Sequence, residues 1–384
     1  MTLAIGTSTA FGVFFKPVMS EFGWNRAMTA GAYSLSWFLQ GLLAVVMGKL
    51  TDRFGPRLVM TLCGTLVGLG YLLTSRIASL AQFYLFFAVV GIGMGGFNVS
   101  LVSTVSRWFV RRRGTMTGIV LAGGGFGSLF TPPIANWLIA TYDWRLSYVI
   151  IGGLIFVTVL LGAQFLRRDP AVMGQRPLGD DLDEKLDASQ DSSQESAIYH
   201  RQFWMVFATY FAFGFCAYFS LVHLAPHATD RGISASEAAR MLSTIGGGVI
   251  LGRIGMGFLG DRIGNRRALI LCFSLMSLGF LFLILVEEMW MLYVFAACIG
   301  FTWGGGTLGP LLLAELFGLR SLGGNVGIIN FGYSFGAGLG PFLAGHLFDV
   351  TRSYRPAFFM ALSVALFALV MSLLLKIRRP GITS

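Results

Sequence analysis

Arg253 is the residue whose chemistry is least expected from its surroundings in this sequence. It stands in GGGVILGRIGMGFLGD, where apolar residues and glycines flank it for more than a helical turn on both sides. A charge inside an apolar span costs about 2.5 to 3.5 kcal/mol on insertion scales, so such residues usually face a water-filled cavity. A guanidinium presents two parallel donors to a carboxylate. Arg253 is therefore predicted to bind an anionic group.

The alternative for Arg253 is a side chain that extends to the membrane surface. Asp261 follows roughly 12 Å further along a helix axis, and a long arginine side chain can cover part of that distance. We favour the cavity because the neighbouring glycines leave packing room beside one.

His223, in FSLVHLAPH, is the second candidate for chemistry inside an apolar run. The ordinary pKa of histidine is about 6.5, so His223 can change protonation at working pH, whereas an arginine cannot. It is therefore predicted to contact the substrate and to carry a coupled proton. The alternative is an imidazole that hydrogen-bonds the backbone near the end of its helix. His227, His346 and Asp349 are expected nearer the surface, as gate or loop residues.

Four further residues are weaker candidates for the wall of a substrate site. Phe97 and Asn98 share one apolar run, and Asn330 and Tyr333 share another. Their aromatic rings and polar groups suit a bound molecule, but hydrogen bonds between neighbouring helices explain them equally well.

The elements that must position these residues are membrane-spanning helices. Of the 384 residues 55% are hydrophobic and 12% charged, against roughly 25% charged in a typical soluble domain. Apolar runs of about 20 residues, each long enough to cross a bilayer core, recur along the chain. We predict an all-α membrane protein with spans near 1–19, 27–48, 57–75, 80–106, 114–141, 145–167, 202–227, 236–258, 267–286, 290–317, 322–349 and 355–377. In the first span only 15 residues precede Lys16, about 22 Å of helix, which is short of the core thickness.

A polar segment divides the twelve spans into two sets of six. Residues 168–201 are rich in Asp, Ser and Gln and are predicted to form a cytoplasmic linker between bundles at 1–167 and 202–378, with a cytoplasmic tail at 379–384. With both termini inside, 19 of the 28 Lys and Arg residues lie on the cytoplasmic side, eight lie outside, and Arg253 is the remaining one. This bias follows the positive-inside rule and predicts a multi-pass protein of the plasma (inner) membrane.

The two sets of helices are a tandem repeat. GKLTDRFGPR at 48–57 and GFLGDRIGNR at 257–266 occupy corresponding turns. We predict a conformational latch, in which an aspartate caps a helix N-terminus and the arginines pair across the halves. The alternative is a generic basic loop. The latch residues are Asp52, Arg53, Arg57, Asp261, Arg262 and Arg266.

GxLxDRxGxR in both places resembles the signature of the major facilitator superfamily, whose fold is two six-helix bundles. RWFVRRRGTMTGIVLAGGGFGSLFTPP at 107–133 and GAGLGPFLAGHLFDVTRSYRPAF at 336–358 are similar to motifs of its monocarboxylate transporter branch, which we group with the oxalate/formate exchangers. This resemblance implies carboxylate transport, and it implies that Arg253, in the eighth helix, binds the substrate.

The sequence departs from that branch at three positions. Mammalian relatives have an aspartate where this chain has Val249 and a lysine about where it has Thr9, and oxalate exchangers have a lysine in the eleventh helix, absent from 322–349. A single central cation suits a monoanion such as lactate, pyruvate or acetate better than oxalate. The same departures leave the proton route open.

Motifs of soluble enzymes are present but lack their structural context. GIGMGG at 91–96 has no preceding strand, and GYSFG at 332–336 lies inside a predicted helix. The four cysteines are scattered singly, so neither a metal site nor a cofactor is predicted. The cations do not line one face, so nucleic acid is not an expected partner. An enzyme is therefore disfavoured.

The predicted function is a proton-coupled secondary transporter of a small monocarboxylate that works by alternating access. Its expected partners are the carboxylate, a proton and the lipid bilayer, and it is expected to act as a monomer. The alternatives are an exchanger of the oxalate/formate type and a proton-driven drug exporter. The exporter typically needs a carboxylate within the membrane, and no Asp or Glu is predicted mid-helix. A transporter-like receptor would usually add a signalling domain.

Overall fold

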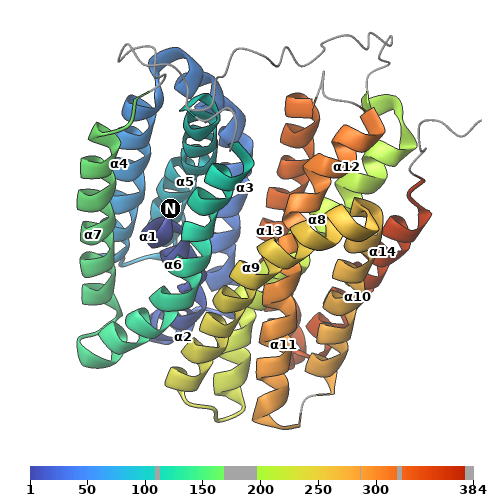
Figure 1. Ribbon diagram of the computed structural model, residues 1–384. Coiled ribbons are helices and arrows are strands. Elements are labelled where there is room, and N and C mark those ends of the chain that lie inside the picture. Colours follow the sequence, from blue (N-terminus) through green and yellow to red (C-terminus); the bar gives the residue numbers. More distant parts are fainter. Residues whose placement is uncertain (109–112, 168–196, 286, 318–321, 377–384) are drawn as a thin grey trace, which may run out of the picture.

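The computed structural model describes residues 1–108, 113–167, 197–285, 287–317 and 322–376. These form helices throughout (Figure 1). The N-terminal half comprises α1 (Thr2–Thr9), α2 (Phe11–Phe22), α3 (Arg26–Phe54), α4 (Pro56–Thr74), α5 (Leu80–Trp108), α6 (Arg113–Thr141) and α7 (Trp144–Gln164). The C-terminal half comprises η2 (Ala197–Tyr199), α8 (Arg201–Asp230), α9 (Ala235–Ile263), α10 (Asn265–Ile284), α11 (Met289–Thr302), η3 (Trp303–Thr307), α12 (Leu308–Phe317), α13 (Leu322–Thr351) and α14 (Arg355–Leu374).

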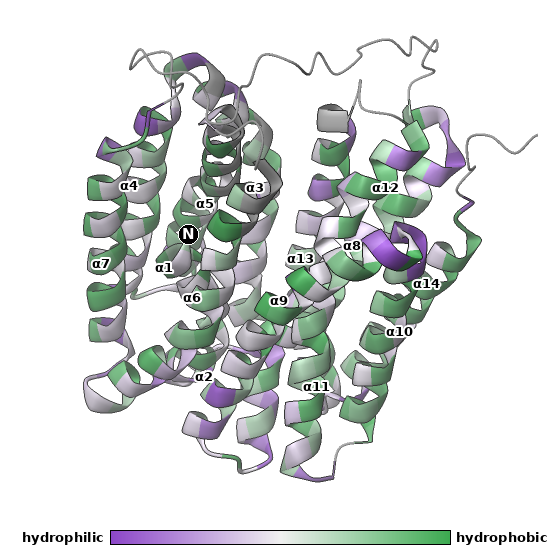
Figure 2. Ribbon diagram, in the orientation of Figure 1, coloured by the Kyte–Doolittle hydropathy of each residue, from purple (hydrophilic) through white to green (hydrophobic). Residues whose placement is uncertain are grey.

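The helices form two bundles that stand side by side (Figure 1). Within the described ranges, nine helical stretches are long and apolar enough to cross a membrane. Three further crossings are made by α1 with α2, by α3 and by α6. Hydrophobic residues cover the bundles, and hydrophilic ones gather toward their two ends (Figure 2). The predicted fold class, twelve membrane helices in two six-helix bundles, is confirmed.

The first crossing is longer than the sequence indicates. Ala10, between α1 and α2, keeps right-handed helical angles of φ −74° and ψ −5°, so the two pieces follow one another along a single path. Lys16 therefore lies within this crossing, which continues to Phe22. Its ammonium group is held by an ion pair with Asp230 of α8 at 2.6 Å, which explains how a lysine is accommodated there.

The repeated motif forms the same turn in both halves. Gly55 joins α3 to α4 with φ 84° and ψ 162°, and Gly264 joins α9 to α10 with φ 90° and ψ 145°. Residues that carry a side chain rarely adopt these backbone angles, so the turn requires glycine at the eighth motif position. We call the end of the molecule that holds both turns the linker end, which is uppermost in Figure 1, and the opposite end the far end.

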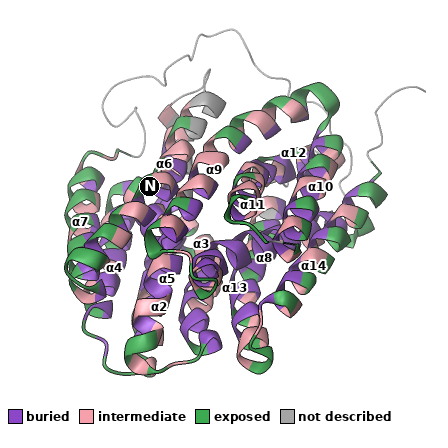
Figure 3. Ribbon diagram, turned by 90° about the horizontal axis from the view of Figure 1, so that it is seen from below, coloured by how far each residue is buried: buried purple, intermediate pink, exposed green. Residues whose placement is uncertain are grey.

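The halves meet through α3 with α13 and through α6 with α9. Near the far end Gly345 of α13 lies against the backbone of Arg26 and Ala27, and at mid-depth Gly41 of α3 lies against Ser334. Seen from the far end, buried faces point inward in both bundles (Figure 3). Glycine permits this close approach because a Cβ atom would meet the facing chain.

Close packing within the C-terminal half depends on α8 against α13. A Cβ atom on Gly336 would collide with the carbonyl oxygen of Phe211, and one on Gly214 with that of Tyr333. Backbone atoms cannot move aside as a flexible side chain would. The contact therefore fixes how near α13, with Tyr333, lies to α8.

We expect Gly336→Ala to lower the free energy of unfolding by about 1 to 3 kcal/mol, because overpacking forces the two backbones apart. Gly327→Ala is the matched control: it lies on the same helix, nothing lies within 4 Å of its added Cβ, and alanine has the higher helix propensity. Thermal unfolding in detergent measures both variants. Equal stability of the two would contradict this account of the helix contact.

Candidate substrate site

Arg253 reaches from one half of the protein to the other. It lies on α9, about 15 Å from the linker end of that helix, and its side chain is partly buried. Nη1 donates a hydrogen bond to the backbone carbonyl of Leu121, on α6 of the N-terminal half. The side chain therefore turns toward the junction of the halves in this structure, instead of extending to the linker end.

A cluster of aromatic side chains lies beside Arg253. It includes Tyr218 and Tyr333, and the Tyr333 hydroxyl donates a hydrogen bond to that of Tyr218 at 3.4 Å. The Tyr218 ring centroid lies 4.0 Å from that of Trp37 and 5.3 Å from that of Trp303. We call Trp37, Tyr218, Trp303 and Tyr333 the aromatic cluster. It draws on both halves, because Trp37 belongs to α3.

Trp303 has a free hydrogen-bond donor. It begins η3, a 3-10 stretch of sequence WGGGT between α11 and α12. Gly304 lies directly on the carbonyl of Gly252, so the backbone of η3 touches α9 next to Arg253. The indole Nε1 is buried and has no hydrogen-bond partner among the described residues. A buried donor without a partner is costly, so a bound molecule or water is expected to accept from it.

The chemistry of this arrangement favours an anion. The guanidinium has five N–H groups, one of which donates to the carbonyl of Leu121. Hydroxyl and indole N–H groups add donors, and the aromatic cluster contains no carboxylate that would repel an anion. The site therefore offers a positive charge and donors within an apolar, aromatic enclosure.

The other predicted wall residues are arranged differently. Tyr333 lies in the aromatic cluster. Phe97 is buried in the core of the N-terminal half, and Asn330 is exposed on α13. The side chain of Asn98 lies outside the described residues. A role in binding for Phe97, Asn98 and Asn330 stays a prediction.

His223 lies apart from Arg253. It is five residues from Tyr218 on α8, about 7.5 Å along the axis, and is only 1% exposed. Its Nε2 is 2.8 Å from the carbonyl oxygen of Pro341 and its Nδ1 is 3.0 Å from the Tyr354 hydroxyl. The backbone bond matches the alternative considered from the sequence. The bond to Tyr354 joins His223 to a group of charged residues at the far end.

Four charged residues and one tyrosine form what we call the far-end cluster: Lys16, Arg26, Asp230, Asp349 and Tyr354. Arg26 donates to Asp230 and to the Tyr354 hydroxyl, and Asp349 accepts from backbone amides of α3. The sequence placed Asp349 near the surface, as a gate or loop residue, but it did not single out Arg26 or Asp230. These two residues are 204 positions apart, and no local pattern links them.

The predicted latch residues do not bridge the halves where the structure describes them. Arg57 donates to Gln164 of its own half, and Arg266 donates to the carbonyl of Leu373 of its own half. Arg53 and Arg262 stack on the neighbouring rings of Phe54 and Phe258. Asp261 is exposed, and the side chain of Asp52 lies outside the described residues. The latch stays a prediction.

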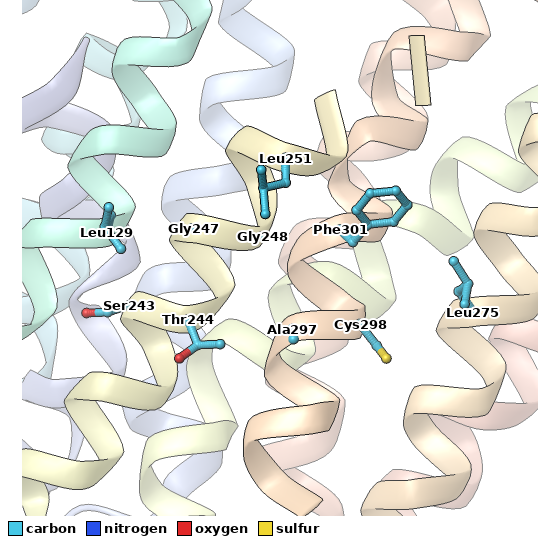
Figure 4. Close-up of a pocket in the computed structure, with 10 residues that line it drawn as sticks. All are labelled: Leu129, Ser243, Thr244, Gly247, Gly248, Leu251, Leu275, Ala297, Cys298 and Phe301. Carbon is cyan, nitrogen blue, oxygen red and sulfur yellow. The ribbon is translucent and has the colours of Figure 1, made fainter. Parts of the chain in front are cut away.

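An apolar pocket of about 620 Å³ lies among α6, α9, α10 and α11 (Figure 4). Its polar groups are satisfied, since the hydroxyls of Ser243 and Thr244 donate to backbone carbonyls one turn earlier. No charged residue lines it, so it does not suit a carboxylate. Leu251 projects into it, whereas Arg253, two residues later, points to the junction of the halves.

Comparison with known proteins identifies the family of this chain. A model of the Major Facilitator Superfamily matches residues 1–256 and 206–383. Human monocarboxylate transporter 11 is 29% identical over 95% of this chain and 78% of its own length. Rat monocarboxylate transporter 13 is 29% identical over 94% of this chain and 82% of its own length.

Solved structures share the fold at lower identity. A bacterial homologue of the human lysosomal transporter Spinster, in an inward-facing and occupied conformation, has a TM-score of 0.72 at 18% identity, covering 97% of this chain and 93% of its own. A point mutant of the nucleoside transporter NupG has a TM-score of 0.76 at 11% identity, covering 97% and 98%. This chain is therefore a membrane transporter that belongs to the major facilitator superfamily.

Proposed function

We propose that this transporter carries small monocarboxylates of the lactate, pyruvate and acetate class, and that Arg253 binds the carboxylate. The observation that carries the proposal is the partly buried guanidinium of Arg253, which lies at the junction of the halves and donates to the carbonyl of Leu121. The names of the two mammalian relatives support it, since both are monocarboxylate transporters. A single central cation suits one carboxylate.

The positions of the proposed site residues support alternating access. Arg253 contacts the carbonyl of Leu121 in the opposite half, and Trp37 of α3 faces Tyr218 of α8. A substrate held here would touch both bundles, so rocking of one bundle against the other changes the side from which the site is reached. Neither half contains the whole site.

Proton coupling would balance the charge of the transported anion. A monocarboxylate that moves with one proton carries no net charge across the membrane. Histidine is the side chain whose unperturbed pKa lies closest to neutral pH, and the hydrogen bonds of His223 tie two elements of the C-terminal half to α8. We assign the coupled proton to His223 on these grounds.

The linker end is assigned to the cytoplasm. Nineteen of the 28 Lys and Arg residues lie on that side under this orientation and eight on the other, as the positive-inside rule requires. Both termini are then cytoplasmic, the protein belongs to the plasma (inner) membrane, and one chain contains a complete site.

Arg253→Ala is expected to abolish uptake of labelled lactate or pyruvate into proteoliposomes, because the carboxylate loses its charged donors. Two such hydrogen bonds account for about a hundredfold or more in uptake rate. Arg240→Ala is the control, since Arg240 is an exposed arginine of the same helix that pairs with Glu237. Uptake by Arg253→Ala at the wild-type rate would refute the assignment.

Small monocarboxylates are expected to raise the thermal unfolding temperature of the purified protein. A ligand at about 100 times its Kd contributes about 2.7 kcal/mol to the folded state. Lactate, pyruvate, acetate and oxalate are compared with sugars and cationic drugs on the wild type and on Arg253→Ala. Stabilisation by sugars or drugs alone would overturn the substrate class.

Trp303→Phe is expected to weaken carboxylate binding about two- to tenfold, because the ring remains while the free N–H is lost. The same thermal titration gives the apparent Kd. Trp290→Phe is a suitable control, since Trp290 is exposed at the start of α11. If both variants bind as the wild type does, Trp303 does not contact the substrate.

A further inference from the structure

Arg26 of the N-terminal half is enclosed by residues of the C-terminal half. It is the first residue of α3, and its side chain is only 8% exposed. The guanidinium bonds Asp230 of α8 and the hydroxyl of Tyr354, and its central carbon lies 3.7 Å above the centre of the Phe348 ring. A charge of one half therefore depends on the other half for all of these partners.

The carboxylates of the C-terminal half bind the N-terminal half at three further points. Asp230 also pairs with Lys16 of α2 at 2.6 Å. Asp349 of α13 accepts from the backbone amides of Arg26 at 3.0 Å and of Ala27 at 2.7 Å. These amides form the positive N-terminus of α3, so a carboxylate is favourable there.

Gly345 makes the last of these contacts possible. It precedes Asp349 by one turn of α13, and a Cβ atom on it would lie 2.9 Å from the amide of Ala27. α13 therefore approaches the start of α3 closely enough for its carboxylate to reach both amides.

Each charge of the far-end cluster is stabilised by partners in the other half. Removing one partner of a buried, hydrogen-bonded charge pair is costly, because the remaining charge stays without water or a counter-charge. When the two halves separate, water can solvate each charge. The cluster therefore has two favourable arrangements, closed with every charge paired and open with every charge solvated, as a gate requires.

The hydrogen bonds of His223 fix the tautomer of its neutral ring in the closed arrangement. The carbonyl of Pro341 only accepts, so Nε2 carries the ring hydrogen. The neutral ring then accepts at Nδ1 from the hydroxyl of Tyr354, whose oxygen accepts in turn from Arg26. Arg26, Tyr354, His223 and Pro341 form one chain of bonds in a single direction.

A second proton on His223 breaks this chain. Nδ1–H would point at an oxygen that already accepts from Arg26, and the hydrogen of the Tyr354 hydroxyl would lose its acceptor. The new charge also faces that of Arg26. The other charged or titratable groups around His223 are Lys16 next to Phe15 on α2, His227 and Asp230 further along α8, and Asp349 on α13.

We propose that Arg26, Asp230 and Asp349 form a gate that holds the far end closed, and that protonation of His223 opens it through Tyr354. The proposal requires a transporter that alternates between two states, but it does not depend on the substrate class. Acid on the far side thus favours the state in which the far end is open.

The gate is tested by measuring the distance between the halves at the far end. Spin labels on Ala78→Cys and Glu288→Cys report it, since both residues are exposed and lie in far-end loops. Cys298 is replaced by serine, and Cys63, Cys216 and Cys272 are fully buried. Pulsed electron spin resonance then gives the ratio of open to closed protein in nanodiscs without substrate.

Arg26→Gln and Asp230→Asn are each expected to raise that ratio about thirtyfold, because both remove the ion pair between Arg26 and Asp230 that joins the halves. Arg355→Gln, which removes an exposed arginine next to Tyr354, should leave it unchanged. Tyr354→Phe preserves the ring and removes only the hydroxyl, so it tests the same chain if a charge variant fails to fold. An unchanged ratio in folded Arg26→Gln or Tyr354→Phe would overturn the gate.

The role of His223 protonation is tested by measuring the open fraction while the pH is lowered from 8 to 5. The open fraction of the wild type should rise, whereas His223→Gln should remain closed, because its amide offers the same donor and acceptor without titrating. Arg253→Ala should respond to pH as the wild type does, which separates this proposal from the substrate assignment. A full pH response in His223→Gln would show that the proton binds elsewhere.

Discussion

A charge inside a membrane protein must have a partner, and this requirement organises the junction of the two halves. Among the described residues, Arg253 and Arg26 both find partners across it. Arg253 of α9 bonds a carbonyl of α6, and Arg26 of α3 bonds Asp230 of α8. Each half thus supplies hydrogen-bond partners for a charge of the other half. The charges that would be most costly to expose to lipid are those that hold the bundles together.

Glycine makes these contacts possible. Helices that carry side chains at every position stay too far apart for an arginine or an aspartate to reach backbone atoms of the next helix. Gly345 brings α13 against the start of α3, and Gly304 brings η3 against α9. The hydrogen bonds of these polar groups therefore depend on nearby glycines, which let the helices approach closely.

Much of the fold and part of the site were predictable from the sequence. Helix positions follow from apolar runs, because bilayer thickness sets their length, and Arg253 stands out because no apolar neighbour can pair with it. Arg26 does not stand out, since Asn25 caps a helix beside it and an arginine there is ordinary at a surface. Its burial results from Asp230 and Tyr354, which only the folded chain brings near. The free N–H of Trp303 likewise depends on the 3-10 turn at WGGGT, a glycine run that hints at an irregular helix without showing which atoms lose their partners.

One helix connects the regions that transport must coordinate. α3 runs for 29 residues without an internal proline, about 43 Å, from Arg26 in the far-end cluster past Trp37 in the aromatic cluster to the repeated motif at the linker end. A straight helix of this length can tilt as a rigid body about a point near its middle. A tilt of about 10° displaces both ends by about 4 Å in opposite directions. The tilt that opens the protein at one end therefore closes it at the other end.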